Sequence, residues 1–147
     1  MGVVGEGLLI GVDVGGTKML AGIVGENGAP VRLTHAPTPP PRAGEQALEH
    51  AVVDLVERVA VGASISAVGL AVAGFVDSAG AHVRYAPHLA WRDAPVRQRF
   101  ERRLAVPVAL DNDATAATHA EVSFGAAVGG GSAVVVNLGA GIGGGYA

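Results

Sequence analysis

Apolar and polar residues alternate with a period of two over the first part of the chain. Apolar, β-branched runs within residues 8–24 lie on both sides of a Gly15-Gly16 corner, and residues 31–35 alternate well enough for a third strand. A turn at residues 26–29 separates this run from the preceding one. The pattern therefore predicts three antiparallel strands before any helix.

The hydrophobic period changes to 3.6 between residues 44 and 61. The apolar positions predict an amphipathic helix that packs one face on the sheet, and the acidic residues, Glu49 among them, are expected on a solvent-facing side. The proline-rich residues 38–42 cannot continue a strand ladder and are expected to form a stiff surface connection. Residues 95–104 predict a second helix, whose four arginines we interpret as compensation of the helix dipole.

Two short, almost unbroken apolar runs predict buried strands: residues 65–73 are expected to be covered on both sides, and residues 106–110 form the second run. Residues 82–90 show no period and are expected to be irregular, whereas the alanine-rich residues 114–124 predict a third helix. This order predicts an α/β fold: a mixed sheet with three antiparallel N-terminal strands, followed by alternating helices and strands.

Composition narrows the function classes. A chain of 147 residues is long enough for one domain with a sizeable core, and its few aromatic residues leave Val, Ala, Leu and Ile to build that core. The net charge of −3 argues against a nucleic acid or a membrane surface as the main partner, and the absence of cysteine excludes disulfides and thiolate metal sites. Without a signal-peptide pattern or a stretch of about 20 apolar residues, we expect a cytoplasmic protein.

The corner between the first two predicted strands carries candidate chemistry. The glycines Gly15 and Gly16 can take positive φ and bring backbone N–H groups close to a phosphate. Thr17 can donate a hydroxyl hydrogen bond, Lys18 is the only lysine of the chain, and Asp13 can hold a magnesium ion directly or through its waters. The alternative is a plain Gly-Gly hairpin turn without a ligand.

Among general phosphate motifs, the Walker loop does not fit this corner. Residues 11–16 have its glycine spacing, but residues 17–18 have Thr before Lys, the reverse of the required order, and no helix follows. Residues 13–18 instead resemble the first phosphate motif of the ROK family of sugar kinases, whose members include many bacterial glucokinases. The resemblance implies an actin-like, ribonuclease-H-like ATPase fold. It also implies ATP and magnesium as cofactors, with the four residues after Val14 on the ATP phosphates and Asp13 toward magnesium through water.

A second group of polar residues follows the run at residues 106–110. Asp111, Asn112 and Asp113 lie at the carboxyl end of a predicted strand, where open α/β sheets gather their ligands. Spacing alone leaves two roles open for Asn112 and Asp113, a helix N-cap or a catalytic group. The run from Asn112 to Ala114, with Ala117 and Glu121, is similar to a ROK motif. That similarity implies Asp113 as the general base in contact with the sugar and Asn112 as a sugar ligand.

Two further segments resemble the sugar site of the family. Residues 74–77 resemble the corner that lines the sugar pocket, which implies Gly74 as a sugar contact, although the residues alone allow an ordinary strand-end turn. Residues 86–93 resemble a ROK glucokinase segment with His88 in place of the usual asparagine, so the hydrogen-bond geometry differs there. Trp91, the only tryptophan, is expected in the core.

The last glycine cluster superficially matches a dinucleotide-binding motif. Gly139, Gly141 and Gly144 have the G-x-G-x-x-G spacing after a strand, but neither the required helix nor the acidic residue follows before Ala147. The cluster is more similar to the second phosphate motif of the ROK family. That similarity implies phosphate contacts from Gly139, Ala140 and Gly141, with Ala140 in place of a threonine hydroxyl.

The resemblance implies an ATP-dependent hexose kinase, with glucose as the favoured hexose. Family members are about twice as long, so we expect residues 1–125 to be the N-terminal lobe and residues 126–147 the start of a truncated second lobe, inactive alone. The zinc motif of the family is absent from this chain. Full-length members are expected to form homo-oligomers, and an open strand edge near residues 134–136 is expected to make this chain self-associate.

Two alternatives stay open. One is a truncated, non-catalytic ROK remnant. The other is a sugar-responsive ROK regulator, disfavoured because only seven residues precede the first predicted strand, which leaves no space for a helix-turn-helix.

Overall fold

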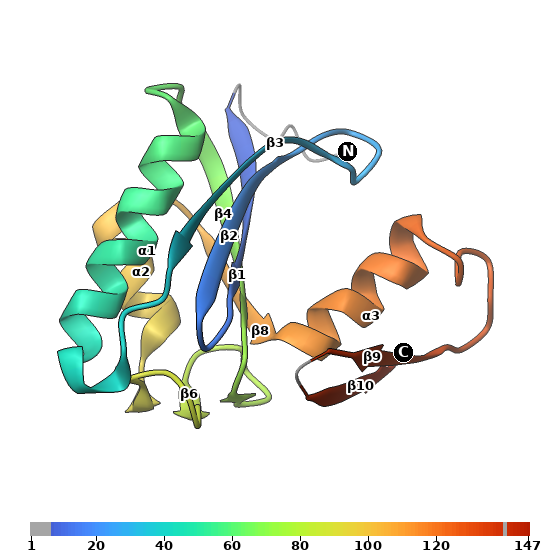
Figure 1. Ribbon diagram of the computed structural model, residues 1–147. Coiled ribbons are helices and arrows are strands. Elements are labelled where there is room, and N and C mark those ends of the chain that lie inside the picture. Colours follow the sequence, from blue (N-terminus) through green and yellow to red (C-terminus); the bar gives the residue numbers. More distant parts are fainter. Residues whose placement is uncertain (1–6, 140) are drawn as a thin grey trace.

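A five-stranded mixed sheet, in the order β3-β2-β1-β4-β8, organises the chain (Figure 1). The computed structural model describes residues 7–139 and 141–147. The sheet consists of β1 (Leu8–Val14), β2 (Lys18–Val24), β3 (Pro30–Pro37), β4 (Ile65–Val72) and β8 (Val108–Asn112). β2 pairs antiparallel with β1 and β3, whereas β4 pairs parallel with β1 and β8. The predicted mixed sheet with three antiparallel N-terminal strands is confirmed.

Two helices cover one face of this sheet (Figure 1). A short 3-10 turn (Pro41–Ala43) leads into α1 (Glu45–Ala60), and α2 (Val96–Leu104) follows later. The inner residues of α1 have 3.6 spacing because they form one stripe of the helix. That stripe is fully buried and comprises Leu48, Val52, Leu55, Val56 and Val59. Trp91 and Phe100 extend the core, with ring centroids 6.2 Å apart in an edge-to-face arrangement, so the predicted core position of Trp91 is confirmed.

The opposite face of the sheet is only partly covered. α3 (Asp113–Phe124) lies on that side (Figure 1). Between the helix and the sheet is a hollow of about 530 Å³ whose floor includes Gly11, Gly69 and Ala109. Burial along β4 therefore alternates, with Val68 buried and Gly69 half-buried. The expectation of strands covered on both faces was wrong here because small residues make a run look uniformly apolar whichever face they occupy.

Short strands form a second, three-stranded sheet. β5 (Phe75–Val76), β6 (Val83–Tyr85) and β7 (Arg92–Ala94) pair antiparallel in that order. The expectation of irregular structure at residues 82–90 was wrong for β6, because strands of two or three residues are too short to show a period.

The C-terminal strands form a separate ribbon. β9 (Val134–Leu138) pairs antiparallel with β10 (Ile142–Tyr146), and one face of the ribbon packs on α3. A Cβ built on Gly143 would lie 3.1 Å from the Cβ of Ala114, so the ribbon approaches α3 closely there. The other face exposes large apolar side chains, namely Val134, Val136, Leu138, Ile142 and Tyr146. Of the helices in the described ranges, none is long and apolar enough to cross a membrane.

An ion-pair cluster joins α1 to α2. Glu49 is 3% exposed, and its carboxylate accepts from Arg99 Nη1 at 2.8 Å and forms an ion pair with Arg103, whose Nη2 lies 3.0 Å away. Arg99 Nη1 also lies 2.6 Å from Glu45 Oε2, and these carboxylate hydrogen bonds raise the pKa of Arg99. The expectation that Glu49 faces solvent was therefore wrong. Two of the four arginines are interhelical partners and not only dipole compensation.

Arg99→Ala is expected to lower the free energy of unfolding by about 2 kcal/mol, because it removes one of the two cations that satisfy a buried carboxylate. Arg102→Ala, an exposed arginine on the same helix, is the matched control and should change stability by less than about 0.5 kcal/mol. Urea unfolding followed by circular dichroism measures both. Equal stabilities for the two variants would contradict a structural role for this cluster.

The exposed face of the β9–β10 ribbon is expected to drive self-association of the 147-residue chain. Light scattering should give an average mass that rises with concentration. The double variant Leu138→Lys/Ile142→Lys changes two directly paired residues and should lower that mass toward the monomer. A parent chain that stays monomeric at every concentration tested would refute the prediction.

Candidate functional site

The β1–β2 turn is closed by backbone contacts. The N–H of Gly15 donates to the carbonyl of Lys18 at 3.1 Å. A Cβ on Gly15 would lie 2.9 Å from that oxygen, and a Cβ on Gly16 would lie 2.6 Å from the Cβ of His88. Neither glycine has positive φ, so the expected conformational reason for glycine was wrong. The turn requires glycine because there is no space for a side chain.

Thr38 fixes this turn from the neighbouring strand connection. Its Oγ1 donates to the carbonyl of Gly15 at 2.7 Å, and its N–H donates to the carbonyl of Thr17 at 3.0 Å. The Thr38 residue is buried. The sequence analysis did not identify Thr38 as a contact of this turn. Thr38 is a polar residue beside a proline run, and that run was expected at the surface.

The register of the strands aligns acidic residues that the sequence analysis singled out. Asp13 is paired with Ala71 of β4, and Ala71 is paired with Asp111 of β8, so these residues form one row across three strands. The next row ends at Asn112, and Asp113 is the first residue of α3. The ends of β1 and β8 therefore lie on the same side of the sheet, toward the lower edge of Figure 1.

Asp13 and Asp113 act on each other electrostatically. Desolvation raises the pKa of the Asp13 carboxyl, the Asp113 carboxylate raises it further, and Lys18 opposes both effects. Asp113 is half-buried. Asp113 therefore lies within electrostatic range of Asp13, the residue two positions before Gly15.

Asn112 is the N-cap of α3. Its Oδ1 accepts from the N–H groups of Ala114 at 2.9 Å and Thr115 at 3.2 Å, while its Nδ2 donates to the carbonyl of Gly74 at 2.9 Å. Of the two roles left open by spacing, the cap belongs to Asn112. Asp113 occupies the first helical position.

Gly74 lies buried beneath the segment that follows β6. A Cβ on Gly74 would lie 2.8 Å from the Cβ of Ala86 and 2.9 Å from the carbonyl oxygen of Tyr85. Because the Gly74 carbonyl also accepts from Asn112, this corner connects the start of α3 to the segment that carries His88. His88 itself is exposed.

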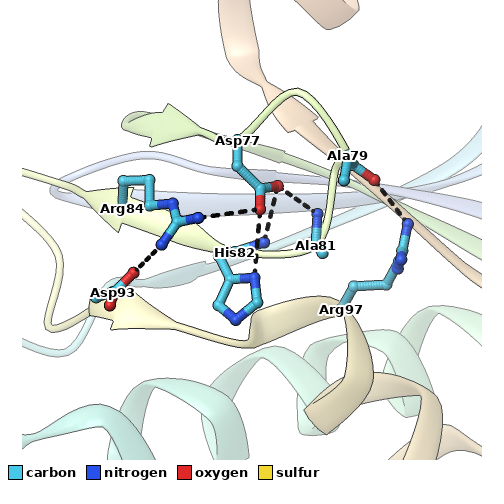
Figure 2. Close-up of polar contacts among 7 residues, drawn as sticks. All are labelled: Asp77, Ala79, Ala81, His82, Arg84, Asp93 and Arg97. Atoms are coloured by element: carbon cyan, nitrogen blue, oxygen red, sulfur yellow. Dashed lines mark hydrogen bonds and ion pairs between the residues drawn. The ribbon is translucent and has the colours of Figure 1, made fainter.

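Asp77 anchors the far end of the same corner (Figure 2). Its Oδ1 accepts from the N–H groups of Ala81 at 2.7 Å and His82 at 3.1 Å, and these hydrogen bonds hold the pKa of the Asp77 carboxyl below its ordinary value. Its Oδ2 lies 3.3 Å from His82 Nδ1 and 3.7 Å from Arg84, which also pairs with Asp93. The turn after Gly74 is therefore fixed by its own side chains.

The second glycine motif forms the β9–β10 turn. Gly139 donates its N–H to the carbonyl of Gly141 at 2.9 Å, and Ala140 lies outside the described residues. Since Gly143 packs on Ala114, this turn lies at the Asp113 end of α3. A strand follows the motif where a dinucleotide fold needs a helix.

The hollow under α3 coincides with the predicted site only at Asp13. It reaches Asp13, Asp111 and His119, whose Nε2 is 3.9 Å from Asp111 Oδ2. The two glycine turns and Asp113 lie outside its lining. Across the described part of the chain, no cluster of three or more metal-ligating side chains is present.

Comparisons with known proteins give one family. A family model described as the ROK family matches residues 9–147. A glucokinase of Streptomyces coelicolor is 40% identical over 139 residues, which are 95% of this chain and 43% of that protein. A crystal structure of a ROK family glucokinase from Streptomyces griseus in complex with glucose and AMPPNP has a TM-score of 0.87 at 39% identity, covering 95% of this chain and 44% of that one.

A transcriptional regulator of the ROK family shares the fold, with a TM-score of 0.78 at 16% identity over 95% of this chain and 36% of that one. The chain thus spans less than half the length of these relatives. That coverage fits the expectation that it corresponds to the N-terminal part of such a protein.

Asp13→Asn is expected to stabilise the fold at neutral pH. Because folding raises the pKa of this carboxyl, the folded chain binds the carboxyl proton more tightly than the unfolded chain does. Above that pKa the carboxyl is charged, and its charge destabilises the folded state. Solvent screening keeps the expected gain in unfolding free energy at pH 7 below about 1 kcal/mol. The gain should shrink as the pH falls toward 3.8, the ordinary Asp value.

Urea unfolding over a pH series measures this difference. Asp54→Asn on the exposed face of α1 is the control and should bring no gain, because it only loses the weak pair with Arg58. An Asp13→Asn chain less stable than its parent at pH 7 would contradict the repulsion between the two acids.

Proposed function

The chain belongs to the ROK family, and we propose that it supplies the base and the phosphate-binding turns of an ATP-dependent hexose kinase. The observation that carries this proposal is the position of Asp113, at the start of α3, electrostatically coupled to Asp13 and adjacent to Asn112. Glucose is the favoured hexose, because the similar Streptomyces proteins are glucokinases and one of them binds glucose. The products are ADP and glucose 6-phosphate.

Asp113 is assigned as the general base. Its carboxylate accepts the proton of the sugar hydroxyl while the hydroxyl oxygen forms a bond to the γ-phosphorus of ATP. The bond between that phosphorus and the bridging oxygen breaks, and ADP leaves with its electron pair. Asn112 and Gly74 orient the sugar, and the hydrogen bond between them supports this assignment because it fixes one relative to the other.

The two glycine turns are assigned to the ATP phosphates. Gly16 and Thr17 would contribute backbone N–H groups, Thr17 also a hydroxyl and Lys18 an ammonium group, while Gly15, whose N–H donates to the Lys18 carbonyl, would bring the turn close to the phosphates. Gly139, Ala140 and Gly141 would approach from the ribbon beside α3. The absence of space for side chains at the first turn supports a role in close backbone approach.

Magnesium suits the charge of the site. Asp13 and Asp113 repel each other, and a dication beside Asp13 would relieve that repulsion through water-mediated contact. The bound ion would neutralise phosphate charge during transfer.

His88 is assigned to the hexose site. Its exposed imidazole follows the segment that packs on Gly74, which supports a position beside the sugar. The end of α3 at Phe124 supports a lobe boundary between residues 125 and 126. ROK regulators share this fold, so turnover decides between a kinase and a non-catalytic relative.

Asp113→Asn is expected to lower kcat by about 10²–10⁴-fold, because it removes the proton acceptor and keeps the shape of the side chain. A coupled assay with ATP and glucose should be run on the protein encoded by the complete reading frame and on the 147-residue chain, which is expected to show little turnover. Asp111→Asn is the matched control, and it should retain activity.

Activity of Asp113→Asn equal to its parent would overturn the assignment of the base. A complete protein that binds glucose without turnover would support a regulator or remnant in place of a kinase.

A further inference from the structure

The segment between β6 and β7 contacts both corners of the candidate site. We define residues 85–91 as the bridging loop. At one end, Ala86 packs so closely on Gly74 that a Cβ there would lie 2.8 Å away. In the middle, the Cβ of His88 packs on Gly16, where a Cβ built on the glycine would lie 2.6 Å from it. The position of this loop therefore affects both the sugar corner and the phosphate turn.

One side chain outside the loop holds its backbone. Arg92 Nη1 lies 2.6 Å from the carbonyl oxygen of Ala86, 2.8 Å from that of Leu89 and 2.6 Å from that of Trp91. The two hydrogens of this nitrogen serve three acceptors, so at least one is shared. The guanidinium also stacks on the ring of Tyr85, with its central carbon 4.6 Å from the ring centroid.

The loop depends on this donor for an electrostatic reason. Three carbonyl oxygens lie within hydrogen-bond distance of one charged nitrogen, and hydrogen bonds from a charged donor are stronger than those from a neutral one. Among the backbone hydrogen bonds outside helices and strands, the loop has one of its own. The N–H of Leu89 donates to the carbonyl of Ala86 at 3.3 Å. Leu89 and Trp91 are buried. Loss of the Arg92 hydrogen bonds is therefore expected to displace the exposed His88 before it displaces these two residues.

We propose that Arg92 is a positioning residue for hexose binding, acting through the bridging loop. It sets the position of His88 over Gly16 and of Ala86 over Gly74 without contacting the substrate. The proposal rests on the assignment of His88 and Gly74 to the hexose site. It predicts that Arg92 affects the KM for the hexose far more than it affects kcat.

The test compares Arg92→Met, Arg92→Lys and the control Arg102→Met in the protein encoded by the complete reading frame. Arg92→Met retains an unbranched apolar stem but has no hydrogen-bond donor. It should raise the KM for glucose by about tenfold to a hundredfold, with kcat within about threefold of the parent. Arg92→Lys supplies three hydrogens but no planar face for Tyr85, so its KM should be intermediate. Arg102 is exposed on α2, and its substitution should change neither constant.

Trp91 provides a second measurement that does not depend on activity. It is the only tryptophan, it is buried, and its carbonyl is one of the three acceptors. In Arg92→Met its fluorescence should shift to longer wavelength and be quenched more by acrylamide, with far-UV circular dichroism unchanged. If the parent protein has no turnover, Trp91 fluorescence alone decides the role of Arg92 in the loop. Failure of the kinase assignment can thus be distinguished from failure of the role proposed for Arg92.

Unchanged quenching with an unchanged KM in Arg92→Met would overturn the proposal. A loss of kcat at constant KM would also overturn it, since the residue would then act on the chemical step. If Arg92→Met does not fold, Arg92→Lys decides. A KM of Arg92→Lys equal to that of the parent would show that the planar guanidinium is not required, which would contradict the expected intermediate effect.

Discussion

The parallel register of β1, β4 and β8 determines where the polar groups of the site lie. Asp13, Ala71 and Asp111 form one row, and Val14, Val72 and Asn112 form the next. A shift of one residue in either ladder would turn Asp13 or Asp111 to the opposite face, where α1 and α2 cover the core. Because α3 begins directly after β8, the same register also fixes Asp113. The packing of Val12, Val14 and Val72 therefore positions the acids, since those buried residues set which face each neighbour occupies.

The glycines of the site are required for space. Gly15, Gly16 and Gly74 each lie where a Cβ would contact backbone or a β-carbon at less than 3.0 Å. None of the three has positive φ. The N–H groups of Gly15 and Gly74 donate to the carbonyls of Lys18 and Val72, so these two glycines fix the turns from within. The close packing also connects the turns mechanically, because the bridging loop touches Gly16 and Gly74 together.

Sequence patterns predicted the local elements well and the long-range contacts poorly. The three N-terminal strands, α1 and α2 follow from periodicity, since each is long enough to show a repeat. Thr38, Glu49 and Arg92 could not be assigned in this way. Each acts on residues that are distant in the chain or on backbone carbonyls, and neither kind of partner leaves a periodic signal.

The candidate site shows the same division. Family resemblance selected Asp113 as the base, and local spacing could not separate it from Asn112. The structure separates their backbone roles, because Asn112 caps α3 and donates to Gly74 while Asp113 begins the helix. A helix N-terminus favours a carboxylate there, since its exposed N–H groups and dipole are positive.

That helix-terminal field acts against the repulsion between Asp113 and Asp13. Desolvation and, to a smaller extent, the charge of Asp113 both raise the pKa of Asp13, so the charged form of Asp13 is unfavourable for folding. The fold nevertheless holds both acids in place, with Lys18 opposing the rise in the pKa of Asp13 and the N–H of Ala114 donating to Asp113 Oδ1 at 2.9 Å. Such an arrangement lowers stability without a ligand and is relieved when positive charge enters the site. In the proposed function, a magnesium ion beside Asp13 would supply that charge.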